Sequence, residues 1–411
     1  KMDDKSNNAE IIVCSFCDSP QNKLDFLVEG NNAFICDICI DKAKEALKIN
    51  NQKKTSFNID SLLKPKEIKD KLDQHIIDQD YAKKTLSVAV YNHYKRILNN
   101  MASDVNIDKS NILLIGPTGT GKTLLAKTLA SILNIPFAIV DATVLTEAGY
   151  VGEDVENVLV RLYHESNYNI NKTQKGIIYI DEIDKIARKN SNPSITRDVS
   201  GEGVQQSLLK IIEGTTANIP PQGGRKHPEQ PLVKVDTTDI LFICGGTFDG
   251  INDVIERRIK GGGIGFDREI ISSSNKHNNL SDIQVEDVIK YGFLPELVGR
   301  LPIISHLNNL DEEALYQILI QPVNSLVNQY TALFKFDNVK LIFQEDALKE
   351  IVKLATERKT GARALRSILE EVMMSIMYDI PNHKNIESCV ITKDVITKKS
   401  KPEITFYKKT A

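Results

Sequence analysis

The stretch that most constrains this chain is Asn111–Thr123, which has the sequence NILLIGPTGTGKT. Its apolar first part, Asn111–Ile115, predicts a short buried strand, and the residues after Thr123 are apolar at helical spacing. Between them, Gly116–Thr123 matches G-x-x-x-x-G-K-[ST], the pattern of a phosphate-binding loop. A chance glycine-rich turn would not require this strand and helix on either side. We therefore predict an α/β domain, with a parallel sheet flanked by helices, built around a bound nucleotide.

The chemistry of this loop suits the phosphates of ATP. Its backbone N–H groups and the positive end of the following helix favour an anion. Lys122 is expected to reach the β- and γ-phosphates, and the Thr123 hydroxyl is expected to hold Mg²⁺. We assign to the nucleotide Gly116, Pro117, Thr118, Gly119, Thr120, Gly121, Lys122, Thr123 and Leu124.

A second apolar run, Lys175–Ile180, ends in the two carboxylates Asp181 and Glu182. We expect Asp181 to hold Mg²⁺ through water and Glu182 to orient or deprotonate the attacking water. The alternative is a surface acidic pair, but charged side chains seldom end so apolar a run without a function. Thr247, after a further apolar run, could sense the γ-phosphate. These residues predict that ATP is hydrolysed, not only bound.

The first 50 residues hold four of the six cysteines, as Cys14-x-x-Cys17 and Cys36-x-x-Cys39 with 18 residues between the pairs. This spacing is typical of a zinc site in which two tight turns each supply two thiolates. A pair of disulfides is the alternative, and it fits an intracellular chain poorly. Four thiolates leave no open position, so we predict a structural Zn²⁺ that supplies the folding energy of a small domain.

Composition limits the class of protein. The chain has 411 residues, 41% hydrophobic and 26% charged, with a net charge of −3. No strong field attracts nucleic acid or an anionic membrane, and no apolar run approaches the ~18 residues of a membrane span. We expect no nucleic-acid partner, no membrane partner and no export. The expected location is a bacterial-type cytoplasm, or an organelle matrix if a transit segment has been removed.

The chain divides into four predicted parts. We expect a zinc-binding domain over residues 1–50 and a polar, flexible linker over 51–64. A large ATPase domain is predicted over 65–309, and a smaller, α-rich lid domain over 310–411. In the large domain, Ile76 and Ile77 are candidates to contact the adenine, although ordinary core isoleucines are the alternative.

Two loops carry bulky side chains between glycines. Tyr150 and Val151 lie between Gly149 and Gly152, where they either staple the loop onto the next helix or form a mobile gripping element. The segment Ile264–Phe266 is surrounded by glycine. Such a loop cannot pack on itself, so it either flexes without a function or docks these side chains in a pocket of another protein.

Two arginines stand out for their positions. Arg300 follows Gly299 at the end of the α/β part, where an arginine finger reaching a neighbouring subunit would lie; an ordinary surface charge is the alternative. Arg363 lies at the start of a long predicted helix, where the helix dipole disfavours a cation. That placement favours a charge directed at phosphate.

Together the motifs resemble one family. The four-cysteine module is followed in order by GPTGTGKT, GYVGEDVEN, IIYIDEIDKI, RDVSGEGVQQ, GGRKHP, GGGIGF, LVGRLP and TGARALRSI. This series resembles the ClpX family of AAA+ unfoldases over nearly the whole chain. The resemblance implies a homohexamer that hydrolyses ATP, unfolds proteins carrying exposed degradation tags and threads them through a pore into a ClpP-type peptidase.

The resemblance also implies roles in the pore. Tyr150 and Val151 would form the loop that grips the substrate. Arg225, Lys226 and His227 would line the entrance and favour negatively charged chain ends. Asp78 is a departure, because the family's adenine-side segment is expected to have Gly there.

Further roles implied by the resemblance concern partners and neighbouring subunits. Ile264, Gly265 and Phe266 would dock on the peptidase ring. Arg300 would act on the ATP of the neighbouring subunit, and Arg363 would couple lid motion to the nucleotide. The zinc domain would dimerise and bind adaptor proteins.

The whole chain has alternative functions. It could be an AAA+ nucleic-acid motor or a remodelling ATPase without a peptidase, or it could be a nucleotide-gated scaffold without turnover.

Overall fold

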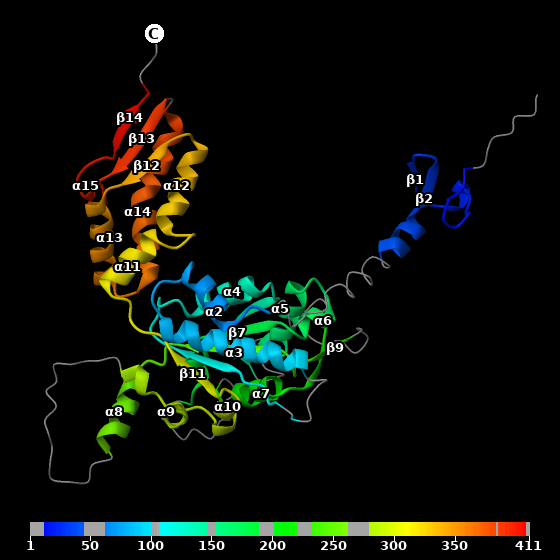
Figure 1. Cartoon of the computed structure of the whole chain (residues 1–411), viewed down its shortest axis with the longest axis horizontal. Coiled ribbons are helices and arrows are strands. Elements are labelled where there is room, and N and C mark those ends of the chain that lie inside the picture. Colours follow the sequence, from blue (N-terminus) through cyan, green and yellow to red (C-terminus); the bar gives the residue numbers. More distant parts are fainter. Residues whose placement is uncertain are drawn as a thin grey trace, which may run out of the picture. The chain divides into compact units, whose positions relative to one another are not determined.

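The chain forms two compact units, residues 1–62 and residues 63–411. Figure 1 shows the computed structural model from which they are described. The residues whose structure is described are 12–44, 62–99, 105, 107–146, 153–188, 201–220, 232–261, 279–383 and 385–407. The predicted linker, 51–64, lies almost entirely outside them.

The first unit is a small hairpin module. Strand β1 (Leu27–Gly30) pairs antiparallel with β2 (Ala33–Cys36), and Leu27 lies opposite Cys36. A 3₁₀ turn, η1 (Gln21–Lys23), precedes the hairpin, and residues 37–44 continue as a helix. The buried side chains of this module include those of Cys14 and Cys36. So small a core is typical of domains that fold around a metal.

The second unit contains a five-stranded sheet, all of whose strand pairs are parallel. Its order is β11-β3-β10-β7-β4, so the first strand in sequence lies inside the sheet. The carboxyl ends of parallel strands meet at one edge, where α/β proteins bind ligands. The bounds are β3 (Ile112–Ile115), β4 (Phe137–Asp141), β7 (Ile177–Asp181), β10 (Leu241–Gly246) and β11 (Ile303–His306).

Helices connect these strands and pack around the sheet (Figure 1). A buried cluster extends from Leu113 to Leu301 and joins the sheet to residues of α5, α7 and α8. The helix bounds are α2 (Pro65–Asp73), α3 (Asp80–Asn99), α4 (Lys122–Leu133), α5 (Asn157–Glu165), α6 (Ile170–Thr173), α7 (Glu202–Glu213), α8 (Ile251–Gly261), α9 (Val285–Tyr291) and α10 (Pro295–Gly299).

Short strands lie between these elements. Strand β6 (Glu153–Asp154) pairs with β5 (Leu145–Thr146), and helix α5 begins after it, at Asn157. A separate antiparallel pair is formed by β8 (Thr216–Ile219) and β9 (Val233–Asp236).

The C-terminal part of the second unit has its own hydrophobic core, extending from Leu315 to Ile396. Its three-stranded sheet has the order β12-β13-β14. The bounds are α11 (Glu312–Ile320), α12 (Leu326–Phe336), β12 (Lys340–Phe343), α13 (Glu345–Arg358), α14 (Ala362–Asp379), β13 (Ile386–Ile391), α15 (Lys393–Ile396) and β14 (Glu403–Phe406).

The turn between α2 and α3 contains the departure noted above. Asp78 has a φ of 57° and Gln79 has a φ of 63°, so both residues adopt the left-handed conformation. Asp tolerates this conformation better than most residues other than Gly. The turn therefore has the geometry that a glycine would favour, although its sequence does not contain one.

Within the described ranges, no helix combines the length and apolar character needed to cross a membrane.

Candidate functional site

The loop after β3 is shaped by glycines. Gly119 and Gly121 have φ values of 80° and 100°, and α4 begins directly afterwards at Lys122. A Cβ on Gly119 would lie 2.2 Å from the carbonyl oxygen of Thr360, so the close approach of that second segment also requires glycine. Glycine is thus required in this loop for two reasons, the left-handed conformation and the close approach of a second segment.

Lys122 is buried at the start of α4. Its Nζ donates hydrogen bonds to the carbonyl oxygens of Gly116, at 2.5 Å, and Pro117, at 2.9 Å. Burial lowers the pKa of Lys122, and the charges of Asp181 and Asp184 oppose that effect. A phosphate would stabilise this buried ammonium group as a charge partner.

The end of β7 lies directly opposite the loop. Thr123 Oγ1 donates a 2.8 Å hydrogen bond to Oδ2 of Asp181. Oδ1 of the same carboxylate accepts from the backbone N–H of Glu182, at 3.0 Å, and from the Tyr179 hydroxyl, at 3.3 Å. The hydroxyl and carboxylate oxygens are adjacent hard ligands of the kind that suit Mg²⁺.

Glu182 has a φ of 53°, a left-handed conformation that is uncommon for this residue type. Such strain persists only where the surroundings hold it, and it is frequent at functional sites. The side chain belongs to the same cleft as Lys122 and Thr123.

Thr247, just after β10, is held by a side chain that the sequence analysis did not single out. Its N–H and Oγ1 donate to the two oxygens of Asp184, at 3.1 and 3.2 Å. Asp184 is nearly fully buried and also pairs with Lys185. A signal was present, because the carboxylate lies three residues beyond Asp181 in a segment that follows an apolar strand.

These groups line a cleft of about 550 Å³ between the α/β core and the C-terminal core. The α/β core supplies the P-loop and the ends of β7 and β10, and the C-terminal core supplies residues of α11, α12, α14 and their connections. The predicted residues that line it are Thr118, Gly119, Gly121, Lys122, Thr123, Leu124, Asp181, Glu182, Thr247 and Arg363.

Arg363 reaches the cleft through a contact between two backbones. Gly361, with a φ of 60°, precedes α14, and a Cβ there would lie 3.0 Å from the backbone of Gly119. The N–H of Ala362 donates a 3.2 Å hydrogen bond to the carbonyl oxygen of Gly119. The first turn of α14 is therefore in direct contact with the P-loop.

Other predicted residues lie elsewhere. Ile76 is buried and Ile77 half-buried, and neither is among the residues lining the cleft, whereas the neighbouring His75 is. Arg300 ends α10 outside the cleft, half exposed, and pairs with Glu213 of α7. The remaining loop residues, Gly116, Pro117 and Thr120, are not among those lining the cleft. The carbonyl oxygens of Gly116 and Pro117 accept from Lys122, and Thr120 Oγ1 donates to the carbonyl oxygen of Pro117.

The sequence analysis also missed side chains from the second core that line the cleft. These include Gln329, which no local motif marks, and Arg366, which lies within the TGARALRSI segment but was not singled out. The predicted residues Tyr150, Val151, Arg225, Lys226, His227, Ile264, Gly265 and Phe266 lie outside the described residues.

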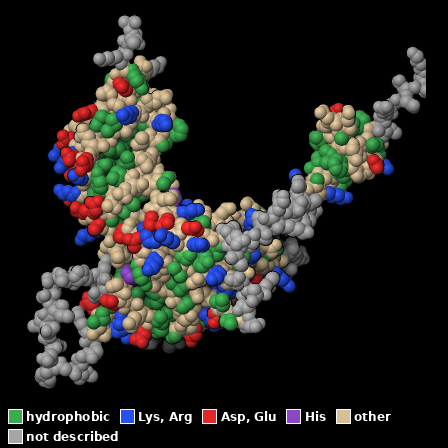
Figure 2. Space-filling model, in the orientation of Figure 1, with side chains coloured by type: hydrophobic (Ala, Val, Ile, Leu, Met, Phe, Trp, Pro, Cys, Tyr) green, Lys and Arg blue, Asp and Glu red, His purple; other side chains and the backbone are tan. Residues whose placement is uncertain are grey.

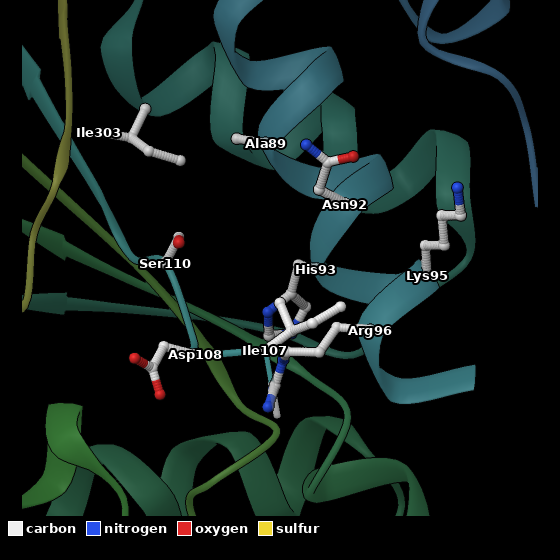
Figure 3. Close-up of a pocket in the computed structure, with 9 residues that line it drawn as sticks. All are labelled: Ala89, Asn92, His93, Lys95, Arg96, Ile107, Asp108, Ser110 and Ile303. Carbon is white, nitrogen blue, oxygen red and sulfur yellow. The ribbon is translucent and has the colours of Figure 1, made fainter. Parts of the chain in front are cut away.

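A second hollow, of about 340 Å³, lies near the amino ends of the strands (Figure 3). His93 Nε2 donates to the carbonyl oxygen of Asp239 at 3.1 Å, and Arg96 pairs with the Asp239 carboxylate at 2.9 Å. Burial lowers the pKa of His93 to about 3, so this ring is neutral at physiological pH. The hollow shares no residue with the phosphate cleft.

The first unit brings together its four predicted ligands. The Sγ atoms of Cys14, Cys17, Cys36 and Cys39 all lie within 4.8 Å of one another. The Sγ atoms of Cys17 and Cys36 are 3.6 Å apart, well beyond a disulfide bond, and all six cysteines are free. The N–H of Cys36 donates to Sγ of Cys14 at 3.3 Å, and the N–H of Cys39 donates to Sγ of Cys36 at 3.4 Å.

The electrostatics of this cluster fit a divalent cation. Burial raises the pKa of Cys14, but hydrogen bonds from the N–H groups of Phe16, Cys36 and Cys17 outweigh it and lower that pKa to about 6. Burial and the neighbouring thiols raise the pKa of Cys39 to about 12. Four crowded thiolates repel one another unless a cation lies between them, and a closed set of four sulfur ligands suits Zn²⁺.

The parallel sheet, the P-loop, the paired carboxylates after β7 and an arginine from a second core at the same cleft define an ATPase of the AAA+ class. Residues 12–48 match the family "ClpX C4-type zinc finger". Residues 107–304 match "AAA domain (Cdc48 subfamily)", and residues 310–392 match "C-terminal, D2-small domain, of ClpB protein".

A curated relative from Treponema denticola, the "ATP-dependent Clp protease ATP-binding subunit ClpX", is 50% identical over 398 residues, which cover 96% of each chain. The chain belongs to the ClpX family. The predicted fold class is confirmed, and so is the prediction of an ATPase. Its cofactors are ATP, Mg²⁺ and, in the four-cysteine module, Zn²⁺.

Proposed function

We propose that this chain is the ATP-driven unfoldase and translocase subunit of a Clp-type protease. The observation that carries the proposal is the composition of the cleft. Lys122 and Asp181 belong to the α/β core, and Arg363 belongs to the C-terminal core. ATP bound here contacts both cores, so loss of the γ-phosphate changes the contacts between them and can move one against the other.

We assign roles at the nucleotide as follows. Lys122 binds the phosphates, Thr123 and Asp181 hold Mg²⁺, and Glu182 orients or deprotonates the attacking water. Arg363 couples the position of the C-terminal core to the phosphates. Mg²⁺ supplies charge neutralisation on the phosphate oxygens when it is bound.

Assembly into a homohexamer completes this site. Arg300 lies outside the cleft of its own chain and is half exposed, so it is free to act on the nucleotide of a neighbouring copy after exchanging its partner Glu213. Ile76 and Ile77 remain candidates for base contacts, and the lining residue His75 is a further candidate in the same turn.

The roles in the pore and in peptidase docking fall on residues outside the described ranges. Tyr150 and Val151 grip the substrate in the pore, and Arg225, Lys226 and His227 line its entrance. The segment Ile264–Phe266 docks on a ClpP-type peptidase. The zinc module dimerises and binds adaptors, and the assembly acts in a bacterial-type cytoplasm.

The alternative is an AAA+ motor that acts on nucleic acid, or a remodelling ATPase without a peptidase. No described feature favours it. The net charge is −3, and acidic and basic side chains are mixed over the face shown in Figure 2. A nucleic-acid motor would be expected to gather basic residues along a track.

One experiment separates these functions. A folded, tagged fluorescent protein is incubated with the full chain and a ClpP-type peptidase, with and without ATP. We expect fluorescence to be lost only with ATP, and we expect Tyr150→Ala to abolish that loss while ATPase activity persists. Phe266→Ala should abolish degradation but not unfolding. ATPase activity stimulated by DNA, with no unfolding of the tagged protein, would replace the proposal with the alternative.

A further inference from the structure

We propose that Gln79 is a positioning residue that locks the turn beside the nucleotide cleft to the segment connecting the two cores, and so couples ATP hydrolysis to movement of the C-terminal core. The inference rests on the proposed function for its mechanical output. The lock itself rests on contacts that are independent of that function.

The side-chain amide of Gln79 makes two hydrogen bonds to the backbone of one residue. Its Nε2 donates to the carbonyl oxygen of Asn308 at 2.9 Å, and its Oε1 accepts from the N–H of Asn308 at 2.8 Å. Gln79 is only 2% exposed, so water competes little for either bond. Two bonds between the same pair of groups fix orientation as well as distance.

Asn308 lies in the covalent connection between the cores. Strand β11 ends at His306 in the α/β core, and α11 begins at Glu312 in the C-terminal core. Any rotation of the C-terminal core about this connection must change backbone angles there. The amide of Gln79 therefore restrains the segment that must bend.

A second contact supports the same connection. The ring of Tyr81, two residues after Gln79, stacks on the ring of His306, with centroids 4.6 Å apart and an angle of 19° between the planes. The start of α3 thus contacts the connection at its beginning and again at Asn308.

The turn that contains Gln79 is stiff. Lys83, itself buried, donates to Oδ1 of Asp73 at 2.5 Å and to the carbonyl oxygen of Ile76 at 3.2 Å, which ties both sides of the turn to α3. The left-handed conformation of Gln79 is uncommon for this residue type. Its two bonds to Asn308 and the 3.0 Å hydrogen bond from the Lys83 N–H to its carbonyl oxygen hold it in place. A stiff turn transmits a displacement instead of absorbing it.

The same turn borders the nucleotide. His75 lines the cleft, and the carbonyl oxygen of Gln74 accepts a 3.2 Å hydrogen bond from the N–H of Val323, between α11 and α12 of the C-terminal core. The turn therefore contacts the cleft, the connection and the second core. Gln79 provides the polar link to the connection.

Gln79 therefore acts in transmitting movement and not in the hydrolysis of ATP. Lys122, Glu182 and Arg363 would still bind and hydrolyse ATP without Gln79. The connection, however, could then flex independently of the turn, and the movement produced by each hydrolysis would be partly lost.

The test uses Gln79→Met in the full chain, because methionine keeps the volume of the side chain and removes both hydrogen bonds. Gln317→Met is the matched control, since the side chain of that half-buried glutamine of α11 donates to Glu313 within the same helix and not to the connection. Three quantities are measured: KM and kcat for ATP hydrolysis, ATP consumed per tagged protein degraded, and hydrogen exchange of the Asn308 amide.

For Gln79→Met we expect KM for ATP to remain close to that of the unmodified chain. Loss of two hydrogen bonds should speed exchange of the Asn308 amide about tenfold and raise ATP consumed per degraded protein by a similar factor. Gln317→Met should match the unmodified chain. An unchanged ATP cost with unchanged exchange would overturn the lock, and so would a Gln79→Met variant that fails only by losing affinity for ATP.

Gln79→Ala distinguishes the lock from simple packing. If Gln79 only fills space, Gln79→Met will behave as the unmodified chain and Gln79→Ala alone will be impaired. If the unmodified chain hydrolyses ATP but unfolds no tagged protein, the proposed function fails, and the exchange of the Asn308 amide still decides whether the lock exists.

Discussion

The hydroxyl of Thr123 lies 2.8 Å from Oδ2 of Asp181, so the first turn of α4 and the end of β7 meet through one hydrogen bond. The two groups are far apart in the chain and come together because β7 and β3 flank β10 in a parallel sheet. Their oxygens point at the same volume, where Mg²⁺ would lie beside the phosphates.

Replacing Thr123 with Val should weaken Mg²⁺ binding selectively, because valine keeps the shape but removes the hydroxyl. We expect the Mg²⁺ concentration for half-maximal ATPase activity to rise at least about tenfold, the loss associated with a bond to a charged group. Titration of the ATPase activity with Mg²⁺ measures this half-maximal concentration. Thr123→Ser should restore the original dependence, whereas an unchanged titration for Thr123→Val would remove this hydroxyl from the metal site.

Glu182→Gln should trap ATP. The amide keeps the size of the side chain but cannot take a proton from water, so turnover should fall by about 10²–10⁴-fold while ATP affinity is retained. Single-turnover hydrolysis and binding of a fluorescent ATP analogue measure the two effects. Glu165→Gln, on the exposed end of α5, is the control. Hydrolysis at the original rate in Glu182→Gln would exclude this residue as the base.

Loss of zinc should unfold only the first unit. Cys17→Ser removes one of four thiolates, and a structural zinc site of this kind contributes about 10–16 kcal/mol of binding energy to folding. We expect the bound zinc to be lost, together with protease resistance of residues 12–44. Basal ATPase activity should persist, because the second unit has separate cores.

Zinc content by atomic emission and limited proteolysis provide the measurements for that prediction. Cys389→Ala, which changes a cysteine of the C-terminal core, should keep its zinc. A Cys17→Ser chain with full zinc content would contradict the assignment of this ligand.

Lys109 should make stability depend on pH. Burial and the nearby Arg96 lower the pKa of Lys109 from 10.5 to about 7. Between these values the unfolded chain holds a proton that the folded chain does not. The free energy of unfolding therefore rises as pH increases across this interval, by an amount on the order of a few kcal/mol.

Urea unfolding at several pH values between 7 and 10.5 measures this effect. Lys109→Met should remove the rise in the free energy of unfolding with pH, and it should stabilise the protein most, relative to the unmodified chain, near pH 7. Lys127→Met, an exposed change on α4, should leave the rise intact. If Lys109→Met kept the same rise of the free energy of unfolding with pH, the rise would belong to another titrating group.

Contiguous residues made much of the site predictable. The loop Gly116–Thr123 holds its phosphate ligands in one turn, and Asp181 follows the strand that positions it. The four cysteines occur in two short pairs, each with only two residues between its members. In all three cases the chemistry depends on local backbone geometry, which neighbouring residues largely determine.

Tertiary structure decided what distant residues contribute. Arg363 reaches the P-loop only because Gly361 and Gly119 pack backbone to backbone. Asp184 holds Thr247, and His75, not Ile76 or Ile77, lines the cleft. Such pairings depend on which side chains two packed elements present to each other, and sequence spacing does not specify that.

The link between Gln79 and Asn308 shows the difference most clearly. By itself the sequence determined that a nucleotide binds at Lys122 and Thr123 and that a separate module holds zinc, because those ligands are local. Only the fold decided that an amide on one side of the cleft holds the connection between two cores, since 229 positions of chain separate the partners. That contact forms when α3 and β11 pack together, and no local pattern predicts it.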